Sequence, residues 1–179
     1  MLQREDTALV VVDVQGKLAQ LMHNKSELFD NLRRMIQGAK ILEVPILVTE
    51  QYPQGIGPTV AEIADLLTDV EAISKTSFSC CGEETFNTAL QGLNRRQILL
   101  TGIETHICVH QTALQLIDAG YEVQVVADAV SSRTPDNKTI GVNKMQVAGA
   151  VITSTETALY ELLRAAEGPQ FKAVLKLVK

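Results

Sequence analysis

Six short apolar runs recur along the chain and predict six β-strands. Most are rich in Val, Ile and Leu without polar alternation, which is typical of strands buried on both faces of a parallel sheet. The runs at residues 72–74 and 151–153 are shorter and weaker. The predicted strands are Thr7–Val12, Pro45–Thr49, Ala72–Ser74, Ile98–Leu100, Val123–Ala127 and Val151–Thr153.

Between these runs, apolar residues recur at the three- and four-residue spacing of amphipathic helices. One helix is expected to begin near Thr105, a suitable N-cap. The others are expected over Ser26–Leu42, Thr59–Leu67, Glu83–Gly92, Asn137–Ala148 and Ser154–Ala166. Two segments, Glu50–Pro58 and Ala129–Pro135, are expected to be loops, and the tail, Phe171–Lys179, is left unassigned.

Strand and helix therefore alternate six times. This alternation predicts one α/β domain over residues 1–179, a three-layer α/β/α sandwich with a six-stranded, mainly parallel sheet of the Rossmann-like kind. The 179 residues are enough to bury a sizeable core. No repeat or linker divides the chain.

Composition limits the partners and the compartment. A net charge of −5, with no cluster of Lys and Arg, argues against nucleic acid as a partner. No apolar run approaches the roughly 20 residues of a membrane-spanning helix, and the N-terminus has no signal-peptide pattern. Three cysteines, an odd number, fit free thiols in a reducing cytoplasm. We therefore expect a cytoplasmic protein with no membrane partner.

Charged or nucleophilic residues follow four of the predicted strands. Asp13, Lys75 and Asp128 each come directly after a strand, and Cys108 falls in the first turn of the helix after the fourth strand. The carboxyl ends of parallel strands meet at one edge of a sheet, where open α/β folds place their sites. We therefore expect these four side chains to converge.

Asp, Lys and Cys brought together form a set suited to nucleophilic catalysis. Lys75 would lower the pKa of the Cys108 thiol, and Asp13 would accept the thiol proton and pass it to a leaving group. Backbone N–H groups around Glu104 and Cys108 would form an oxyanion hole. The alternatives are ordinary structural roles: a cysteine buried in the core, and an Asp13–Lys75 ion pair that only braces the sheet.

Other chemistries lack the residues that they require. A phosphotransferase of the haloacid-dehalogenase type needs a second carboxylate two residues after Asp13, where Gln15 stands. Neither a glycine-rich dinucleotide motif nor a Walker loop is present. His106 and His110 are four residues apart but lack a paired Glu. We therefore expect no metal and no cofactor.

Four motifs together resemble the isochorismatase-like hydrolase superfamily, in the subgroup of isochorismatase-domain-containing proteins. They are VVDVQ at Val11–Gln15, SKTSF at Ser74–Phe78, GIETHICVHQTA at Gly102–Ala113 and VADAVSSR at Val126–Arg133. The third motif is the most specific, and the resemblance extends from Thr7 to about Leu163. It implies an α/β/α hydrolase, commonly a homo-oligomer, that acts on a small-molecule substrate.

The resemblance also implies roles for individual residues. Asp13 matches the catalytic acid/base, Lys75 the catalytic lysine and Cys108 the nucleophile. A non-proline cis peptide would join Ile103 to Glu104, and the amides of Glu104 and Cys108 would form the oxyanion hole. The residues expected to contact substrate are Gln15, Tyr52, Phe78 and His106.

Departures from the family pattern narrow the activity. Nicotinamidases carry a metal-binding D-x-H motif after the second strand, whereas Thr49–Pro53 reads TEQYP. The presence of Cys108 favours hydrolysis of a small amide or related C–N bond through a thioester. The alternatives are vinyl-ether hydrolysis, a catalytically silent oligomeric binding or scaffold protein, and a thiol redox sensor that uses Cys80 or Cys81.

Overall fold

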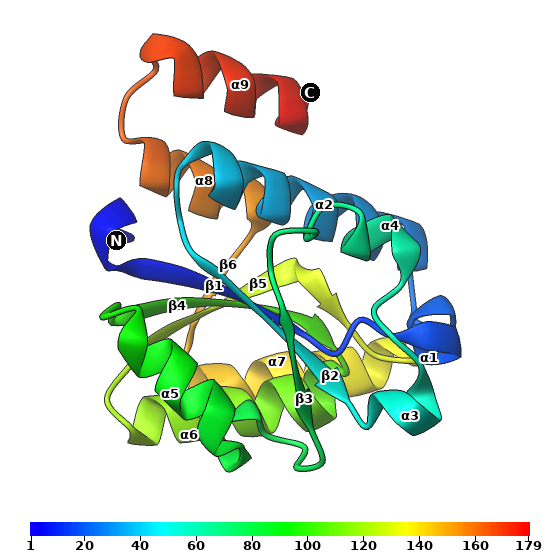
Figure 1. The fold of residues 1–179 in the computed structure, drawn as a ribbon. Helices are drawn as coiled ribbons and strands as arrows, with labels where there is room; N and C mark the ends of the chain where they lie inside the picture. The colour runs from blue at the N-terminus through cyan, green and yellow to red at the C-terminus, as the bar shows by residue number, and fades with distance from the viewer.

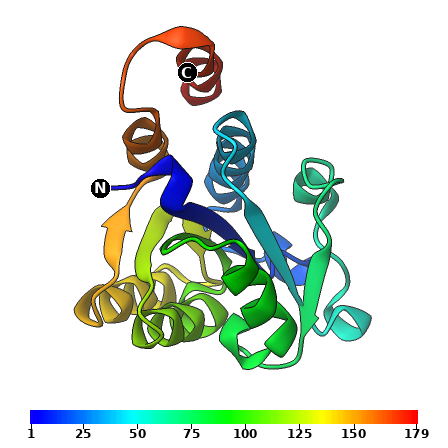
Figure 2. The ribbon, with the colours of Figure 1, turned by 60° about the vertical axis from the view of Figure 1, so that its left-hand side comes forward.

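The computed structural model describes residues 1–179 as three layers, with helices on both faces of a six-stranded sheet (Figures 1 and 2). The strands are β1 Thr7–Val12, β2 Ile46–Gln51, β3 Ala72–Lys75, β4 Gln97–Ile103, β5 Glu122–Ser131 and β6 Val151–Thr153. All neighbours pair in parallel, in the order β3-β2-β1-β4-β5-β6. The predicted fold class is confirmed.

The helices divide between the two faces of the sheet, as Figure 2 shows. One face carries α2 (Lys25–Ile41), α4 (Ala61–Ala64) and α8 (Thr155–Leu163). The other carries α5 (Glu84–Gly92), α6 (His110–Asp118) and α7 (Pro135–Val147). Two short helices, α1 (Gly16–Gln20) and α3 (Pro53–Ile56), lie at the end of the sheet where β1 and β2 finish (Figure 1).

Strand β1 shows why a continuous apolar run is needed at the centre of the sheet. Every residue of the strand is buried. Leu9 and Val11 belong to the apolar cluster under α2 and α8, whereas Ala8, Val10 and Val12 belong to the cluster on the opposite face. Because side chains alternate between faces, both faces of this strand must be apolar.

The chain returns to the middle of the sheet between β3 and β4. Strands β1, β2 and β3 build one half outward, and β4 then pairs with the free side of β1. The strand order therefore reverses between β1 and β4. Ligands in open α/β sheets bind in the crevice outside the carboxyl ends of the strands at such a reversal. This topology selects the segments after β1 and β4 as the candidate site.

The C-terminal tail, which the sequence pattern left unassigned, forms α9 (Gly168–Val178). Figures 1 and 2 both show α9 lying on the outer side of α2 and α8, as a partial additional layer. Val174 is fully buried, and Phe171 and Val178 pack against the same apolar cluster as α2. The apolar residues of the tail therefore cover the protein's own core.

Three local expectations need correction. The expected loop at residues 129–135 is partly strand, because β5 continues to Ser131 and pairs with Ile103 after a register shift in β4. Asp128 thus lies inside β5 rather than after it, and its carboxylate accepts hydrogen bonds from Thr155 at the start of α8. The expected loop at residues 50–58 contains the short helix α3.

The third correction concerns the segment that carries Cys108. Residues Thr105–Val109 form a π-helical turn, and α6 begins only at His110. Glu104, not Thr105, is the residue that precedes the turn, and the Thr105 hydroxyl is buried without a hydrogen-bond partner. Cys108 therefore lies in a wider turn before the helix proper.

Gly102 provides a test of the packing between β1 and β4. Its φ of +108° is a conformation that residues with side chains rarely adopt, and an added Cβ would lie 2.1 Å from the Val12 carbonyl oxygen. We expect Gly102→Ala to lower the free energy of unfolding by at least about 2 kcal/mol, measured by urea denaturation.

The control is Gly92→Ala at the end of α5, where an added Cβ meets no atom within 4 Å. This variant should be neutral or up to about 1 kcal/mol more stable, because Ala has the higher helix propensity. Equal stability of the two variants would contradict the packing described for Gly102.

Candidate active site

Asp13 and Lys75 form a buried ion pair at the carboxyl end of the sheet. Asp13 directly follows β1, and Lys75 is the last residue of β3. The Lys75 Nζ lies 2.6 Å from Asp13 Oδ2, and the two side chains are 0% and 4% exposed. The expectation that these strand ends converge is confirmed for this pair.

The Lys75 ammonium is fully surrounded by acceptors. Besides the Asp13 carboxylate, Nζ donates to Gln51 Oε1 at 2.7 Å, to the Phe78 carbonyl at 3.0 Å and to the Ser77 carbonyl at 3.1 Å. An ammonium group has three protons, so the Gln51, Phe78 and Ser77 acceptors use all of them, and the contact with Asp13 is ionic. Lys75 therefore has no proton left for a ligand and acts on the site through its charge.

The two oxygens of the Asp13 carboxylate differ. Oδ1 accepts a hydrogen bond from the Thr49 hydroxyl at 2.7 Å. Oδ2 forms the ion pair with the Lys75 ammonium and has no hydrogen-bond partner. Since a buried carboxylate oxygen is expected to hold a hydrogen bond, Oδ2 is the available proton acceptor of the site.

Cys108 lies beside this pair, and its thiol is protonated at neutral pH. Burial and, next, the negative charge of Asp13 together raise the pKa of Cys108 to about 12, against the opposing charge of Lys75. Lys75 does lower the pKa of the thiol, as expected, but desolvation and Asp13 outweigh it, so the expected thiolate is not the resting form. Ionisation of Cys108 therefore requires transfer of its proton to a base.

Cys80 is a second buried thiol next to the pair, which the sequence pattern placed only in a loop. Its Sγ lies 3.6 Å from the Thr49 hydroxyl, and burial raises its pKa to about 11. Burial also raises the pKa of the neighbouring Cys81. Because redox-sensing cysteines are acidic and accessible, these pKa directions argue against the redox-sensor interpretation.

One cavity of about 120 Å³ opens onto Asp13 and Cys108. The predicted residues Gln15, Phe78 and Glu104 also line it, whereas Lys75 lies behind Asp13. The sequence pattern missed five lining residues, which are Leu18, Gln51, Ile56, Ile103 and Ile107. Four of these are apolar residues that alone carry no chemical signal.

Tyr52 and His106 do not line this cavity. Tyr52 is 55% exposed and borders a separate hollow beside β3 with Thr76 and Glu83. The His106 Nδ1 is 2.9 Å from the Ser132 hydroxyl, with which it forms a hydrogen bond. Their placement as substrate-contacting residues is therefore not supported by the geometry, and Gln51 occupies the wall where Tyr52 was expected.

Gln15 holds one wall of the cavity in place. Its Nε2 donates to the carbonyls of Gln51 at 3.1 Å and Gly57 at 2.7 Å, and its Oε1 accepts from the Gln51 backbone N–H at 2.6 Å. The amide is fully buried, and both of its N–H donors are used. Gln15 is therefore a positioning residue for the segment between β2 and α3.

The turn before Cys108 is fixed by Glu104. The peptide bond between Ile103 and Glu104 is cis, as the family resemblance implies. The Glu104 carboxylate accepts from the backbone N–H of Arg133 at 3.1 Å and from its Nε at 3.2 Å. This contact ties the turn after β4 to the segment after β5.

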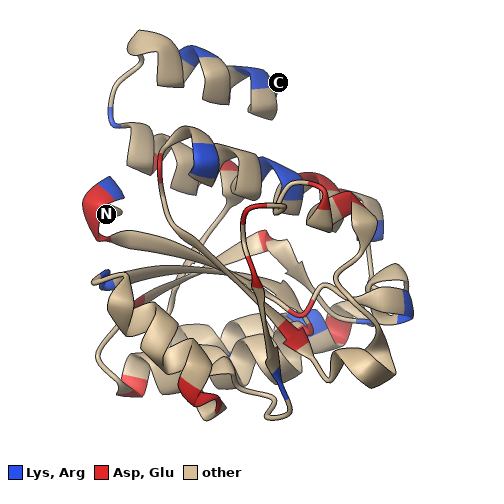
Figure 3. Ribbon diagram, viewed as in Figure 1, with Lys and Arg blue, Asp and Glu red and all other residues tan.

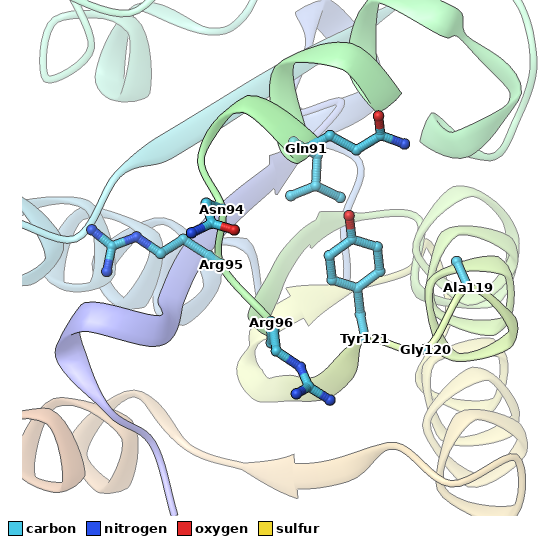
Figure 4. A pocket seen from close by; sticks show the side chains of 8 residues that line it. Gln91, Asn94, Arg95, Arg96, Ala119, Gly120 and Tyr121 are labelled. Carbon is cyan, nitrogen blue, oxygen red and sulfur yellow. The ribbon is translucent and has the colours of Figure 1, made fainter.

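Charge elsewhere does not form a competing site. In Figure 3, acidic and basic segments are interspersed over helices and loops, and the strands are mostly uncharged. A hollow of about 320 Å³ lies at the opposite end of the sheet, before β4 and β5 (Figure 4). Its lining includes Arg95, Arg96 and Tyr121 but no acid or thiol, and the two arginine side chains diverge.

No helix is long and apolar enough to cross a membrane.

The fold and the site define a three-layer α/β protein that brings a thiol, a carboxylate and an ammonium group to one crevice. The chain belongs to the isochorismatase family of hydrolases, because residues 7–157 match the isochorismatase domain. It is 40% identical over 178 residues to isochorismatase domain-containing protein 2 of Xenopus laevis, covering 99% of this chain and 85% of that protein.

A second relative is the secreted isochorismatase effector Isc1 of Phytophthora sojae. The two are 40% identical over 177 residues, covering 97% of this chain and 84% of the effector. The chain thus matches most of the length of both relatives.

Solved structures agree with the family. The MAR1 ribonuclease of Caenorhabditis elegans is 36% identical, with a TM-score of 0.93 over 99% of this chain and 91% of that one. YcaC of Pseudomonas aeruginosa, solved with hexane-2,5-diol and covalent acrylamide, is 25% identical, with a TM-score of 0.92 over 98% and 90%. YcaC of Escherichia coli, described as an octameric hydrolase of unknown specificity, is 26% identical, with a TM-score of 0.92 over 98% and 88%.

The raised pKa of Cys108 predicts that its thiol reacts slowly with alkylating reagents. A pKa of about 12 leaves about one thiol in ten thousand ionised at pH 8, so alkylation of Cys108 by iodoacetamide should be far slower than that of an ordinary cysteine. Asp13→Asn should accelerate the reaction, because it removes a negative charge that raises the pKa.

Peptide-level mass spectrometry from pH 7 to 10 separates Cys108 from the other two cysteines. Cys81→Ser serves as the control, since this half-buried residue lies outside the cavity lining. Fast alkylation at pH 7 that Asp13→Asn leaves unchanged would contradict the electrostatic description.

Proposed function

We propose that this protein is a cofactor-free cysteine hydrolase that cleaves a small amide or related C–N bond. The observation that carries the proposal is the shared cavity of Cys108 and Asp13, with the Lys75 ammonium buried behind the carboxylate. A nucleophile, a base beside it and a charge that holds the base are the elements that acyl transfer requires.

The first half of the reaction forms a thioester. The amide carbonyl carbon lies against Cys108 Sγ, and Asp13 Oδ2 accepts the thiol proton as the S–C bond forms. The backbone N–H groups of Glu104 and Cys108 serve as the oxyanion hole. The C–N bond then breaks, and the proton on Asp13 passes to the departing nitrogen. Lys75 stabilises the Asp13 carboxylate in the resting state.

The second half consumes one water molecule. Asp13 accepts a proton from this water as its oxygen attacks the thioester carbon. The C–S bond breaks, the acid product leaves and the proton returns to the Cys108 sulfur. One amide and one water therefore yield one carboxylic acid and one amine or ammonia, and the site is restored.

A neighbour supports the reactive role of the site. YcaC of Pseudomonas aeruginosa is described with covalent acrylamide, a small amide that is also an electrophile. We infer that this chain likewise admits small amides to its thiol. Its cavity of about 120 Å³ is well below the roughly 300–1,000 Å³ of sites for drug-sized ligands.

The other interpretations have less support. Vinyl-ether hydrolysis needs no nucleophilic thiol, whereas Cys108 lines the cavity beside a base. A silent scaffold accounts for the buried ion pair as a brace of the sheet, but not for a cavity that opens onto both the carboxylate and the thiol. The neighbour from Caenorhabditis elegans is described as a ribonuclease, but none of the cavity-lining residues here is Lys or Arg to contact a phosphate.

The nucleophile is tested by substitution and by trapping. With small primary amides as substrates, Cys108→Ala should lower kcat/KM by about 10³-fold or more, because Cys108 is the only thiol that lines the cavity. Hydroxylamine should divert the wild-type thioester to a hydroxamate, measured by its iron(III) colour, and this product should be absent with Cys108→Ala.

The matched control is Cys80→Ala, which removes the second buried thiol but not the proposed nucleophile. It should retain hydroxamate formation. Equal loss in both variants would indicate a shared structural effect, and full turnover by Cys108→Ala would exclude the proposed nucleophile.

We also propose that the protein is a homo-oligomer. The support is the Escherichia coli neighbour, described as octameric, at 26% identity. Light scattering coupled to size-exclusion chromatography should give a mass that is a multiple of 19.5 kDa. A mass equal to a single chain would exclude this proposal.

A cytoplasmic location is proposed from the free thiols. Cys80, Cys81 and Cys108 form no disulfide, which fits a reducing compartment. The relative from Phytophthora sojae is described as secreted. The location of that relative therefore differs from the cytoplasmic location proposed for this chain.

A further inference from the structure

We propose that the acyl part of the substrate is small, uncharged and apolar. The inference rests on the proposed function, because it concerns the part of the cavity that surrounds the group attacked by Cys108. Three features carry it: the apolar walls, the polar groups that are already paired, and the charge of the lining.

The walls around the thiol are apolar and come from four separate segments. Leu18 lies on α1, Ile56 on α3, Ile103 at the end of β4 and Ile107 in the π-helical turn. Phe78 is 56% exposed and also lines the cavity, so its ring lies at the mouth. An acyl group that fills this space contacts hydrocarbon on most sides, which favours apolar substituents.

The cavity is also small. Its volume of about 120 Å³ is below the roughly 300–1,000 Å³ of sites for drug-sized ligands. A branched chain of a few carbon atoms fits this volume.

Apart from Asp13 Oδ2, most of the polar side-chain groups in the wall already have partners in the protein. Both donors and the acceptor of the Gln15 amide are used, and Gln51 accepts from Lys75 and donates to the Thr76 carbonyl at 2.8 Å. The Glu104 carboxylate is held by Arg133. A charged or polar substituent on the acyl group would therefore lose its water and find few free partners.

The charge of the lining disfavours an anion in particular. Asp13 and Glu104 both line the cavity, whereas their counter-ions, Lys75 and Arg133, do not. A substrate carboxylate would therefore meet the Asp13 carboxylate and no free cation. A substrate ammonium would have to compete with Lys75 and Arg133 for those carboxylates.

The experiment compares amides of the same shape. Isovaleramide and malonamate present an isopropyl group and a carboxylate of similar outline on the same CH₂–CONH₂ unit. Butyramide and β-alaninamide form a second pair, with a methyl group against an ammonium group. We expect kcat/KM, from ammonia release, to favour the uncharged member of each pair by at least about a hundredfold.

A second readout is independent of turnover. Protection of Cys108 from iodoacetamide, measured by mass spectrometry, reports occupancy of the cavity. Isovaleramide should protect at concentrations where malonamate does not. If malonamate or β-alaninamide matches its uncharged partner in either readout, or if neither uncharged amide protects or turns over, the inference is wrong.

The two hypotheses can fail separately. Protection by isovaleramide without any hydroxamate from wild type would exclude the hydrolase proposal and retain the specificity. Cys108-dependent hydroxamate formation with a preference for malonamate would support the hydrolase proposal and exclude the proposed specificity.

A pair of variants places the specificity in the wall. Leu18→Arg puts a cation at the cavity and should shift the isovaleramide-to-malonamate ratio towards malonamate by at least tenfold. Leu21→Arg, at the 63% exposed residue after the same helix, should leave the ratio unchanged. An equal shift in both variants would assign the effect to net charge rather than to the cavity.

Discussion

The buried pair of Asp13 and Lys75 is the interaction on which the arrangement of the site depends. Removing one member of a buried pair costs about 3–5 kcal/mol, because the other charge is left without a partner. Lys75 comes from the edge strand β3 and Asp13 follows the central strand β1, so the pair crosses β2. Thr49, on β2, donates to the same carboxylate. Three adjacent strands thus hold one proton acceptor in one orientation.

The fourth contributor, Cys108, reaches this acceptor because of strand order. Strand β4 pairs with β1 and brings the following turn over the Asp13 carboxylate. The close approach at Gly102 is part of this contact, and Glu104 is tied to Arg133 just beyond it. The position of the thiol is therefore set by backbone packing, whereas its resting protonation is set by burial and by the neighbouring carboxylate.

Sequence reasoning found the layers and the three chemical groups for a physical reason. Continuous apolar strands force a parallel sheet, and residues at strand ends then meet at one edge. It failed for Asp128, because β5 continues past this residue and its carboxylate binds the start of α8. It named Tyr52 rather than Gln51 as a wall residue, and the strand β2 continues two residues beyond the predicted end, to Gln51. The pKa direction of Cys108 was also wrong, since the depth of burial around a thiol has no signature in residue spacing.

The apolar walls and the charged pair belong to different parts of the chain. Leu18, Ile56 and Ile107 lie on short helical segments that connect the larger elements, whereas Asp13 and Lys75 are anchored to strands. Replacing a wall residue alters the shape offered to a ligand without moving the proton acceptor. The fold thus keeps reactivity and selectivity in separable segments, so one scaffold can change its choice of ligand through single substitutions while the sheet beneath stays intact.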